Sequence, residues 1–174
     1  MSAESSLFTT FEGDTYYHWY QSPFGNLLVT GNRSALSTLT FPNKNAIVAD
    51  QWIKDPGQFK EVCRQLDHYF AGDLKTFELP LAPRGTRFQQ SVWAELMKIP
   101  YGDTTSYGVI AKKLDNPKAV RAVGSANGRN PIPVIIPCHR VVGSDGSLTG
   151  FGGGLPTKSF LLNLENSDQL ILPV

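Results

Sequence analysis

Cys138, His139 and Arg140 follow one another directly after Pro137 and form the most chemically reactive stretch of the chain. A free thiol, with a pKa of about 8.5, is a poor nucleophile at neutral pH, but a neighbouring imidazole or cation lowers that pKa and raises the thiolate fraction. Successive residues of a regular strand point to opposite faces, so contact between the thiol and His139 needs a turn or a bridging water. These residues alone indicate either a nucleophilic cysteine or a buried cysteine beside a structural histidine.

Metal, nucleotide and hydrolase chemistry find little support elsewhere in the chain. The Cys and His residues, at positions 18, 63, 68, 138 and 139, lack the paired spacing of zinc ligands, so no metal site is expected. The segment GFGGGLPTKS at 150–159 lacks the glycine that precedes the lysine of a phosphate-binding loop. A cysteine hydrolase needs a histidine distant from the cysteine, and only His18 and His68, both in the other half, qualify.

The elements around Cys138 are expected to be short. The segment PIPVIIPCHRVV at 131–142 is rich in proline and β-branched residues, which predicts a buried extended strand that ends at a tight turn. Three helices are predicted before it, at 86–99, 105–114 and 116–127, and the first opens with the capping-box pair Thr86 and Gln89. Closely joined helices of this length suggest a helix-turn-helix whose last helix reads DNA, although many enzymes contain such pairs.

The third of these helices has an unusual composition. Asn116 is its expected cap and Pro117 its first residue, and Arg121 is the single long basic side chain of its body. Its remaining residues are mostly small: Ala119, Ala122, Gly124, Ser125 and Ala126. Small residues allow either close packing on a neighbouring helix or close approach to a DNA groove, and Arg121 favours the groove.

The N-terminal half has a different pattern. Alternating residues between 15 and 41 predict two or three antiparallel strands, and an apolar stripe from Phe59 to Phe70 predicts a helix capped by Asp55. Cys63 lies in that stripe and is expected to be a buried structural thiol. The segment PLAPRG at 80–85 has the composition of a domain linker.

The net charge of the chain also changes sign near residue 84. Residues 1–84 carry 7 Lys/Arg against 9 Asp/Glu, a net −2, whereas residues 85–165 carry 9 against 5, a net +4. The basic C-terminal half suits an anionic partner, or reflects ordinary surface variation. The first twenty residues lack a secretory signal pattern, and no apolar run approaches the roughly 18 residues of a membrane span. An intracellular protein without a membrane partner is therefore expected.

Three segments of the C-terminal half closely resemble the O6-alkylguanine-DNA alkyltransferase family. They are FQQSVWAELMKIPYGDTTSYG at 88–108, NPKAVRAVGSANGRNPIP at 116–133 and IPCHRVVGSDGSLTGFGGG at 136–154. The resemblance is continuous from about Thr86 to Glu165, and the PCHRV pentapeptide is its most specific part. It implies an α/β (α+β) chain with a ribonuclease H-like α/β roll over 1–84 and a helix-turn-helix, winged-helix-like domain over 85–174.

The resemblance also implies a reaction: single-turnover transfer of an alkyl group from O6-alkylguanine in double-stranded DNA to Cys138, with O4-alkylthymine as a further substrate. No cofactor is implied. His139, held by Glu165, would deprotonate the thiol through a water, and Asn130 would brace the turn before it. The helix with Arg121 would enter the minor groove, and Arg121 would replace the flipped base in the stack.

Other positions receive roles from the same resemblance. Tyr107 would crowd the phosphate beside the target and donate to guanine N3, and the carbonyls of Cys138 and Val141 would accept from the guanine amino group. Further implied contacts are made by the substrate-pocket residues Pro133, Phe151 and Gly152, and by the DNA-facing residues Ala119, Ala122, Gly124, Ser125 and Arg129. Arg129 fits a phosphate contact and a solvated surface arginine about equally.

This sequence departs from the family in the pocket loop. Phe151 stands where many relatives have tyrosine, and Gly152 stands where some have serine, which leaves a backbone donor for the guanine oxygen. The N-terminal zinc site of some relatives has no matching ligands here. The rival function, an alkyltransferase-like lesion binder without transfer, is disfavoured because such proteins have tryptophan in place of the cysteine at 138. A monomer is expected, cytoplasmic in a bacterium or archaeon and nuclear in a eukaryote, and cooperative binding along DNA stays open.

Overall fold

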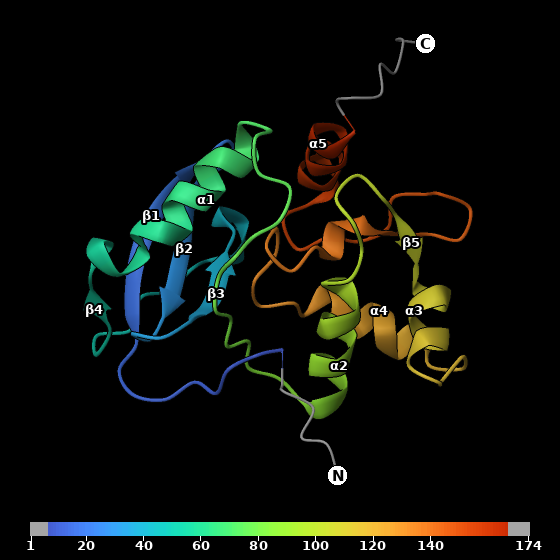
Figure 1. Cartoon of the computed structure of the whole chain (residues 1–174), viewed down its shortest axis with the longest axis horizontal. Helices are drawn as coiled ribbons and strands as arrows, with labels where there is room; N and C mark the ends of the chain where they lie inside the picture. The colour runs from blue at the N-terminus through green and yellow to red at the C-terminus, as the bar shows by residue number, and fades with distance from the viewer. Residues whose placement is uncertain (1–6, 167–174) are drawn as a thin grey trace.

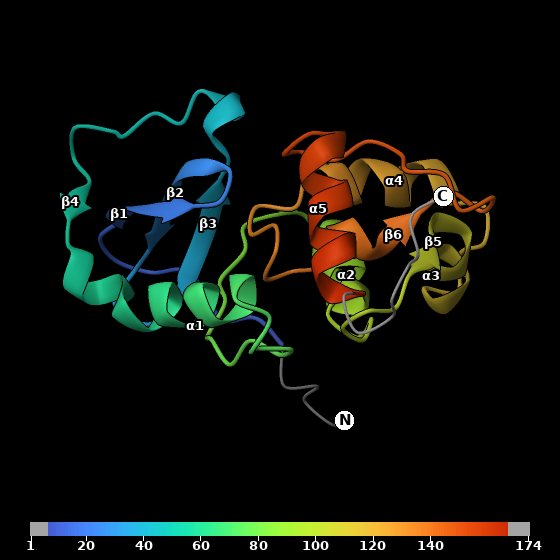
Figure 2. The same ribbon diagram turned by 90° about the horizontal axis from the view of Figure 1, so that it is seen from above.

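The computed structural model describes residues 7–166, which form a sheet-bearing N-terminal half and a helical C-terminal half (Figure 1). The sheet contains β1 (Tyr16–Ser22), β2 (Gly25–Gly31), β3 (Leu36–Thr40) and β4 (Ile53–Lys54), in the order β3-β2-β1-β4. The first three strands pair antiparallel, as the alternation predicts, and β4 adds a short parallel edge to β1. A single 3-10 turn, η1 (Pro42–Lys44), follows β3 and lies on the side of the C-terminal half (Figure 2).

Helix α1 (Lys60–Phe70) covers one face of this sheet (Figure 1). The side chain of Asp55 caps the chain as expected, but the first turn is 3-10 helix, η2 (Pro56–Phe59), and the α-helix begins after it. The buried stripe contains Phe59, Val62, Leu66 and Tyr69. Cys63 was expected to be buried and is only half-buried, because it lies at the border of the stripe.

The C-terminal half consists of short elements. They are α2 (Arg87–Leu96), β5 (Thr105–Ser106), α3 (Tyr107–Lys113), α4 (Val120–Gly128), η3 (Cys138–Arg140), β6 (Val141–Val142) and α5 (Leu155–Glu165). The capping box of Thr86 and Gln89 is present at α2, and Ser106 caps α3 through Val109 N, so both predicted starts are confirmed. Strands β5 and β6 pair in parallel.

Two sequence-based expectations for this half are wrong. Helix α4 begins at Val120 and not at Pro117, because Asp115 adopts a left-handed φ of 54° and residues 116–119 close a separate turn with a bond from Ala119 N to Asn116 O. The connection from α3 therefore has two turns and is longer than predicted. The segment before Cys138 is no strand either: it makes one isolated bridge, and Ile136 N bonds back to Ile132 O.

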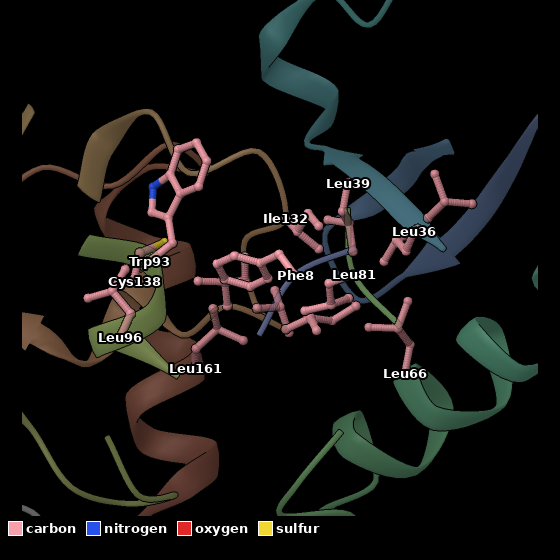
Figure 3. Packing of buried hydrophobic residues seen from close by; sticks show 14 of the residues in the cluster. Phe8, Leu36, Leu39, Leu66, Leu81, Trp93, Leu96, Ile132, Cys138 and Leu161 are labelled. Atoms are coloured by element: carbon pink, nitrogen blue, oxygen red, sulfur yellow. The ribbon is translucent and has the colours of Figure 1, made fainter. Parts of the chain in front are cut away.

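A continuous apolar core joins the two halves. Phe8 and Leu81 lie between the sheet side and the helical side of the cluster, and Ile132 and Leu161 extend it toward the helices (Figure 3). Phe160 of α5 is 40% exposed, and the centroid of its ring lies 5.0 Å from that of Phe24. Within residues 7–166 no helix is long and apolar enough to cross a membrane.

Candidate active site

Cys138 begins the 3-10 turn η3 and lies in the core beside Trp93 and Leu96 (Figure 3). Its side chain is buried, with 4% of the residue exposed. The turn begins after Pro137, whose carbonyl accepts from Arg140 N at 3.0 Å. The predicted tight turn is thus confirmed, and it takes His139 and Arg140 away from a strand's alternating geometry.

The side chains of His139 and Arg140 converge on Glu165, in the last turn of α5. His139 Nε2 lies 2.8 Å from Glu165 Oε1, and Arg140 donates to both carboxylate oxygens at 2.9 Å. Arg140 also donates to Ile99 O at 2.6 Å. Tyr69 of α1 donates to Glu165 Oε1 at 2.7 Å, so the N-terminal half contributes to this cluster.

The electrostatics of the cluster define its protonation. Burial raises the pKa of Glu165, but hydrogen bonds from His139 and Arg140 outweigh burial and bring it to about 2. Burial lowers the pKa of His139 despite the opposing effect of Glu165, so the imidazole is neutral at rest. Its Nε2 proton then points at the carboxylate, and Nδ1 is buried without a partner among the described residues. His139 therefore presents a base whose orientation the carboxylate holds.

The thiol itself is not activated at rest, contrary to the expectation from its neighbours. Burial raises the pKa of Cys138 to about 11, and a hydrogen bond with Asn130 and the charge of Lys158 reduce that rise only in part. Desolvation wins because the whole side chain lies in the apolar core. A reaction at Cys138 consequently needs a base to take the thiol proton.

Lys158 is a polar residue that sequence reasoning did not single out. It is fully buried, and Nζ donates to Val141 O at 2.6 Å and to Thr149 O at 2.9 Å. Burial lowers its pKa, and the charge of Cys138 as a thiolate raises it. Nothing in the sequence marks this role, because Lys158 is distant from Cys138 along the chain and reaches it only through the packing of α5.

Two asparagines connect the thiol to the preceding helix. Asn130 donates to Ile136 O at 2.7 Å and accepts from Ile132 N at 3.0 Å, so it braces the turn as expected. Asn127, in the last turn of α4, donates to Cys138 O at 3.4 Å and was not predicted. Cys138 O also accepts from Val141 N, so both of its lone pairs are in use. A guanine amino group would have to displace the long Asn127 bond.

The predicted pocket loop lies against the N-terminal half. The Phe151 ring is 5.6 Å from that of Phe41 and 6.5 Å from that of His139, and Asn43 donates to Gly152 O at 3.3 Å. A groove of about 330 Å³ borders this contact, and its lining includes Phe41, Lys44, Arg129, Asn130, Pro133 and Gly152. The fold therefore brings four predicted residues, Arg129, Asn130, Pro133 and Gly152, to one groove.

Helix α4 presents its small residues and Arg121 to solvent. Val123, Ala126 and Asn127 are buried, whereas Arg121, Ala122 and Ser125 are exposed. Trp93 of α2 fixes this orientation, because its Nε1 donates to Ala126 O at 2.9 Å. Within the described residues, the Arg121 side chain has no ion pair or hydrogen bond. Ala119 is the N-cap and lies outside the helix body.

Tyr107 connects this helix with the pocket loop. Its hydroxyl lies 2.8 Å from Thr149 Oγ1, and a Cβ on Gly124 would lie 3.8 Å from its ring. The small residue at 124 thus lets α4 pass the Tyr107 ring in ordinary contact. Among residues 7–166 no group of acidic, histidine or cysteine side chains could hold a metal ion.

Comparison with known proteins gives matches over both halves. The family models "6-O-methylguanine DNA methyltransferase, DNA binding domain" and "6-O-methylguanine DNA methyltransferase, ribonuclease-like domain" match residues 87–167 and 15–83. A methylated-DNA--protein-cysteine methyltransferase of Methanosarcina acetivorans is 52% identical over 154 residues, which are 87% of this chain and 99% of that protein. One of Mycobacterium bovis is 48% identical over 153 residues, 87% of this chain and 93% of that protein. The crystal structure of Mycobacterium tuberculosis OGT in complex with DNA aligns with a TM-score of 0.83 and 49% identity, covering 87% of this chain and 93% of that one.

Proposed function

Because the chain belongs to the 6-O-methylguanine DNA methyltransferase family, we propose that Cys138 is the residue that accepts the alkyl group. The chain is a methylated-DNA–protein-cysteine methyltransferase, a DNA-binding repair enzyme that transfers an alkyl group from O6-alkylguanine to one of its own cysteines. Of its two cysteines, Cys63 is half-buried on α1, and burial and Asp67 raise its pKa to about 11. Cys138 alone adjoins a histidine held by a carboxylate, and that 2.8 Å contact of His139 with Glu165 is the observation that carries the proposal.

Deprotonation is the first step. The thiol proton passes through a water to His139 Nδ1, the ring nitrogen that has no partner among the described residues. The imidazolium that results is stabilised by Glu165, whose low pKa keeps it ionised throughout. Lys158 and the Asn130 amide favour the thiolate, because both lower the thiol pKa.

Alkyl transfer follows by in-line attack. The thiolate electron pair forms the S–C bond, the C–O6 bond breaks, and its electron pair leaves with guanine, which takes a proton at N3 from Tyr107. The proton that His139 took from the thiol is released to solvent, and the Tyr107 phenolate takes a proton back from solvent. Atoms and electrons balance without a cofactor or metal. The product is a thioether that no group of this site reverses, so each chain reacts once. O4-alkylthymine has the same alkyl–oxygen bond and is a further expected substrate.

DNA contact is assigned to the exposed face of α4. Its small residues Ala122, Gly124 and Ser125 permit close approach to the minor groove, and Arg121 is placed to fill the gap left by the flipped base. Ala119 at the N-cap and Arg129 after the helix are assigned to the backbone contact. Within residues 7–166 the Arg121 side chain has no hydrogen bond or ion pair. This supports the role, because no existing interaction has to break before the side chain inserts into DNA.

The flipped guanine is assigned to the space beside Phe151. Phe151 would stack on the base, Gly152 would offer its backbone amide to O6, and Pro133 would border the alkyl group. Val141 O accepts from Lys158 Nζ and has a second lone pair for the guanine amino group. Pro133 and Gly152 line the same groove, which supports their assignment to one pocket.

The proposed function also includes a domain boundary, an oligomeric state and a cellular compartment for the protein. We assign residues 1–84 to an N-terminal ribonuclease H-like domain and 85–174 to the DNA-binding and transferase domain. The two family models, which end at 83 and begin at 87, support this boundary. The protein acts as a monomer on double-stranded DNA, without a membrane partner, inside the cell where that DNA lies: the cytoplasm of a bacterium or archaeon, or the nucleus of a eukaryote.

Intact mass spectrometry tests the proposal. After incubation with an O6-methylguanine duplex, the protein should gain one methyl group, and peptide mapping should place it on Cys138. Cys63→Ala should react as the parent does, whereas Cys138→Ala should bind the duplex without gaining mass. A methyl group on Cys63, or turnover beyond one equivalent, would falsify the assignment of Cys138.

A further inference from the structure

The proposed proton relay of Cys138, His139 and Glu165 receives a hydrogen bond from the N-terminal half of the molecule. Tyr69 lies in α1, 96 positions before Glu165, and its hydroxyl donates to Glu165 Oε1 at 2.7 Å. The same hydroxyl lies 3.5 Å from His139 Nε2. Figure 2 shows α5, which carries Glu165, on the side of the C-terminal half that faces the sheet and α1. The contact therefore crosses the boundary between the two halves.

Burial and ring packing hold the Tyr69 hydroxyl in place. Tyr69 is completely buried, and its ring contacts Phe77 at 5.2 Å and Tyr101 at 6.2 Å between centroids. Burial and the charge of Glu165 raise the pKa of Tyr69 far above neutrality, so the hydroxyl always carries its proton. It is a fixed donor, and a donor aimed at a carboxylate forms a stronger hydrogen bond than one between neutral groups.

We propose that Tyr69 is a positioning residue for the alkyl-transfer reaction. Its hydroxyl holds the Glu165 carboxylate in place and weakens the interaction of that carboxylate with the Nε2 proton of His139. The inference rests on the proposed function, in which His139 takes the thiol proton. It gives the N-terminal domain a direct part in the chemistry, because the relay is complete only when α1 is docked against α5.

Tyr69 influences His139 through the hydrogen bonds that both residues donate to Glu165 Oε1. Oε1 accepts from Tyr69, from His139 and from Arg140 Nη2, so its negative charge is shared among three donors. If the tyrosine hydroxyl is removed, more of that charge acts on His139 and the imidazolium becomes more stable. Proton transfer from the thiol to His139 then becomes easier.

Other charged groups face the same pair and stay in place in such a variant. Arg140 and Lys158 both lower the pKa of His139. Tyr101 lies against the Tyr69 ring and acts electrostatically on it. Because none of these groups changes, a shift in titration can be attributed to the Tyr69 hydroxyl.

The test compares two tyrosine variants. Tyr69→Phe removes the relay contact, and Tyr20→Phe is its matched control, because Tyr20 is buried in the same half and donates to the Asp67 carboxylate at the same 2.7 Å. The rate of Cys138 alkylation by iodoacetamide is measured against pH by peptide mass spectrometry, in full-length Cys63→Ala protein. In Tyr69→Phe the rate below neutral pH, where the thiolate forms by proton transfer to His139, should rise roughly 3- to 10-fold. In Tyr20→Phe this rate should be unchanged.

Two further proteins, one with Glu165→Gln and one with fluorinated tyrosines, complete the test. In Glu165→Gln protein, Tyr69→Phe should cause no change in this rate, because the carboxylate charge that the Tyr69 hydroxyl shares is absent. If Tyr69→Phe does not fold, 3-fluorotyrosine at all six tyrosines strengthens the donor without removing it, and the rate below neutral pH should fall. An unchanged rate in the substituted or the fluorinated protein, or an equal rise in Tyr20→Phe, overturns the inference. Iodoacetamide reports on the thiol without DNA, so a failure of alkyl transfer to Cys138 would be seen separately.

Discussion

Arg121→Ala separates base flipping from the chemistry at Cys138. Arg121 is exposed near the start of α4, and its neighbours on that face, Ala122 and Ser125, are too short to fill a vacated base position. Flipping costs a few kcal/mol, and we expect the arginine to offset roughly 2–3 kcal/mol of it. At 1.4 kcal/mol for each factor of ten, transfer from duplex DNA should slow by roughly 30- to 150-fold.

The assay compares single-turnover rates on a saturating O6-methylguanine duplex and on free O6-benzylguanine, which needs no flipping. Arg121→Ala should lose rate on the duplex only, since Cys138 and its relay are unchanged. Arg129→Ala is the matched control: it removes an exposed arginine after the same helix, and we expect weaker binding that a higher DNA concentration restores. Equal losses on duplex and free base would refute the role given to Arg121, and so would restoration by excess DNA.

Two predictions concern residues that support the pocket. Lys158→Met removes the buried ammonium, so the thiol pKa should rise by roughly one unit and alkylation at pH 8 should slow about tenfold; an unchanged pH profile would contradict the electrostatic role. Loss of its two carbonyl contacts should also lower the free energy of unfolding by ~1–3 kcal/mol for each, measured by urea denaturation. Gly153→Ala would place a Cβ 3.0 Å from ring atoms of Phe41 and Phe151, so transfer should slow several-fold, whereas Gly150→Ala, with nothing within 4 Å, should react as the parent does. Equal rates in the two alanine variants would show that the loop adapts.

Local interactions explain which parts of the fold the sequence predicts well. The caps at Thr86 and Asp55 are correct because a capping side chain bonds to a backbone amide within three residues. The antiparallel strands follow from alternation along a single chain segment. The start of α4 is wrong because the left-handed Asp115 inserts a turn that the Asn116–Pro117 cap pattern does not reveal.

The sequence by itself predicted the three residues on which the proposed function depends, Cys138, His139 and Arg121, because they stand in segments that closely resemble the family. Only the tertiary structure decided how they are tuned. Burial, and not the adjacent imidazole, dominates the resting thiol pKa, and that burial arises from contacts with distant helices. Lys158 and Tyr69 reach the site from α5 and α1, and the Tyr69 contact spans 96 positions. Such contacts leave no mark in sequence spacing, because only the packing of the two halves brings the groups within hydrogen-bond distance.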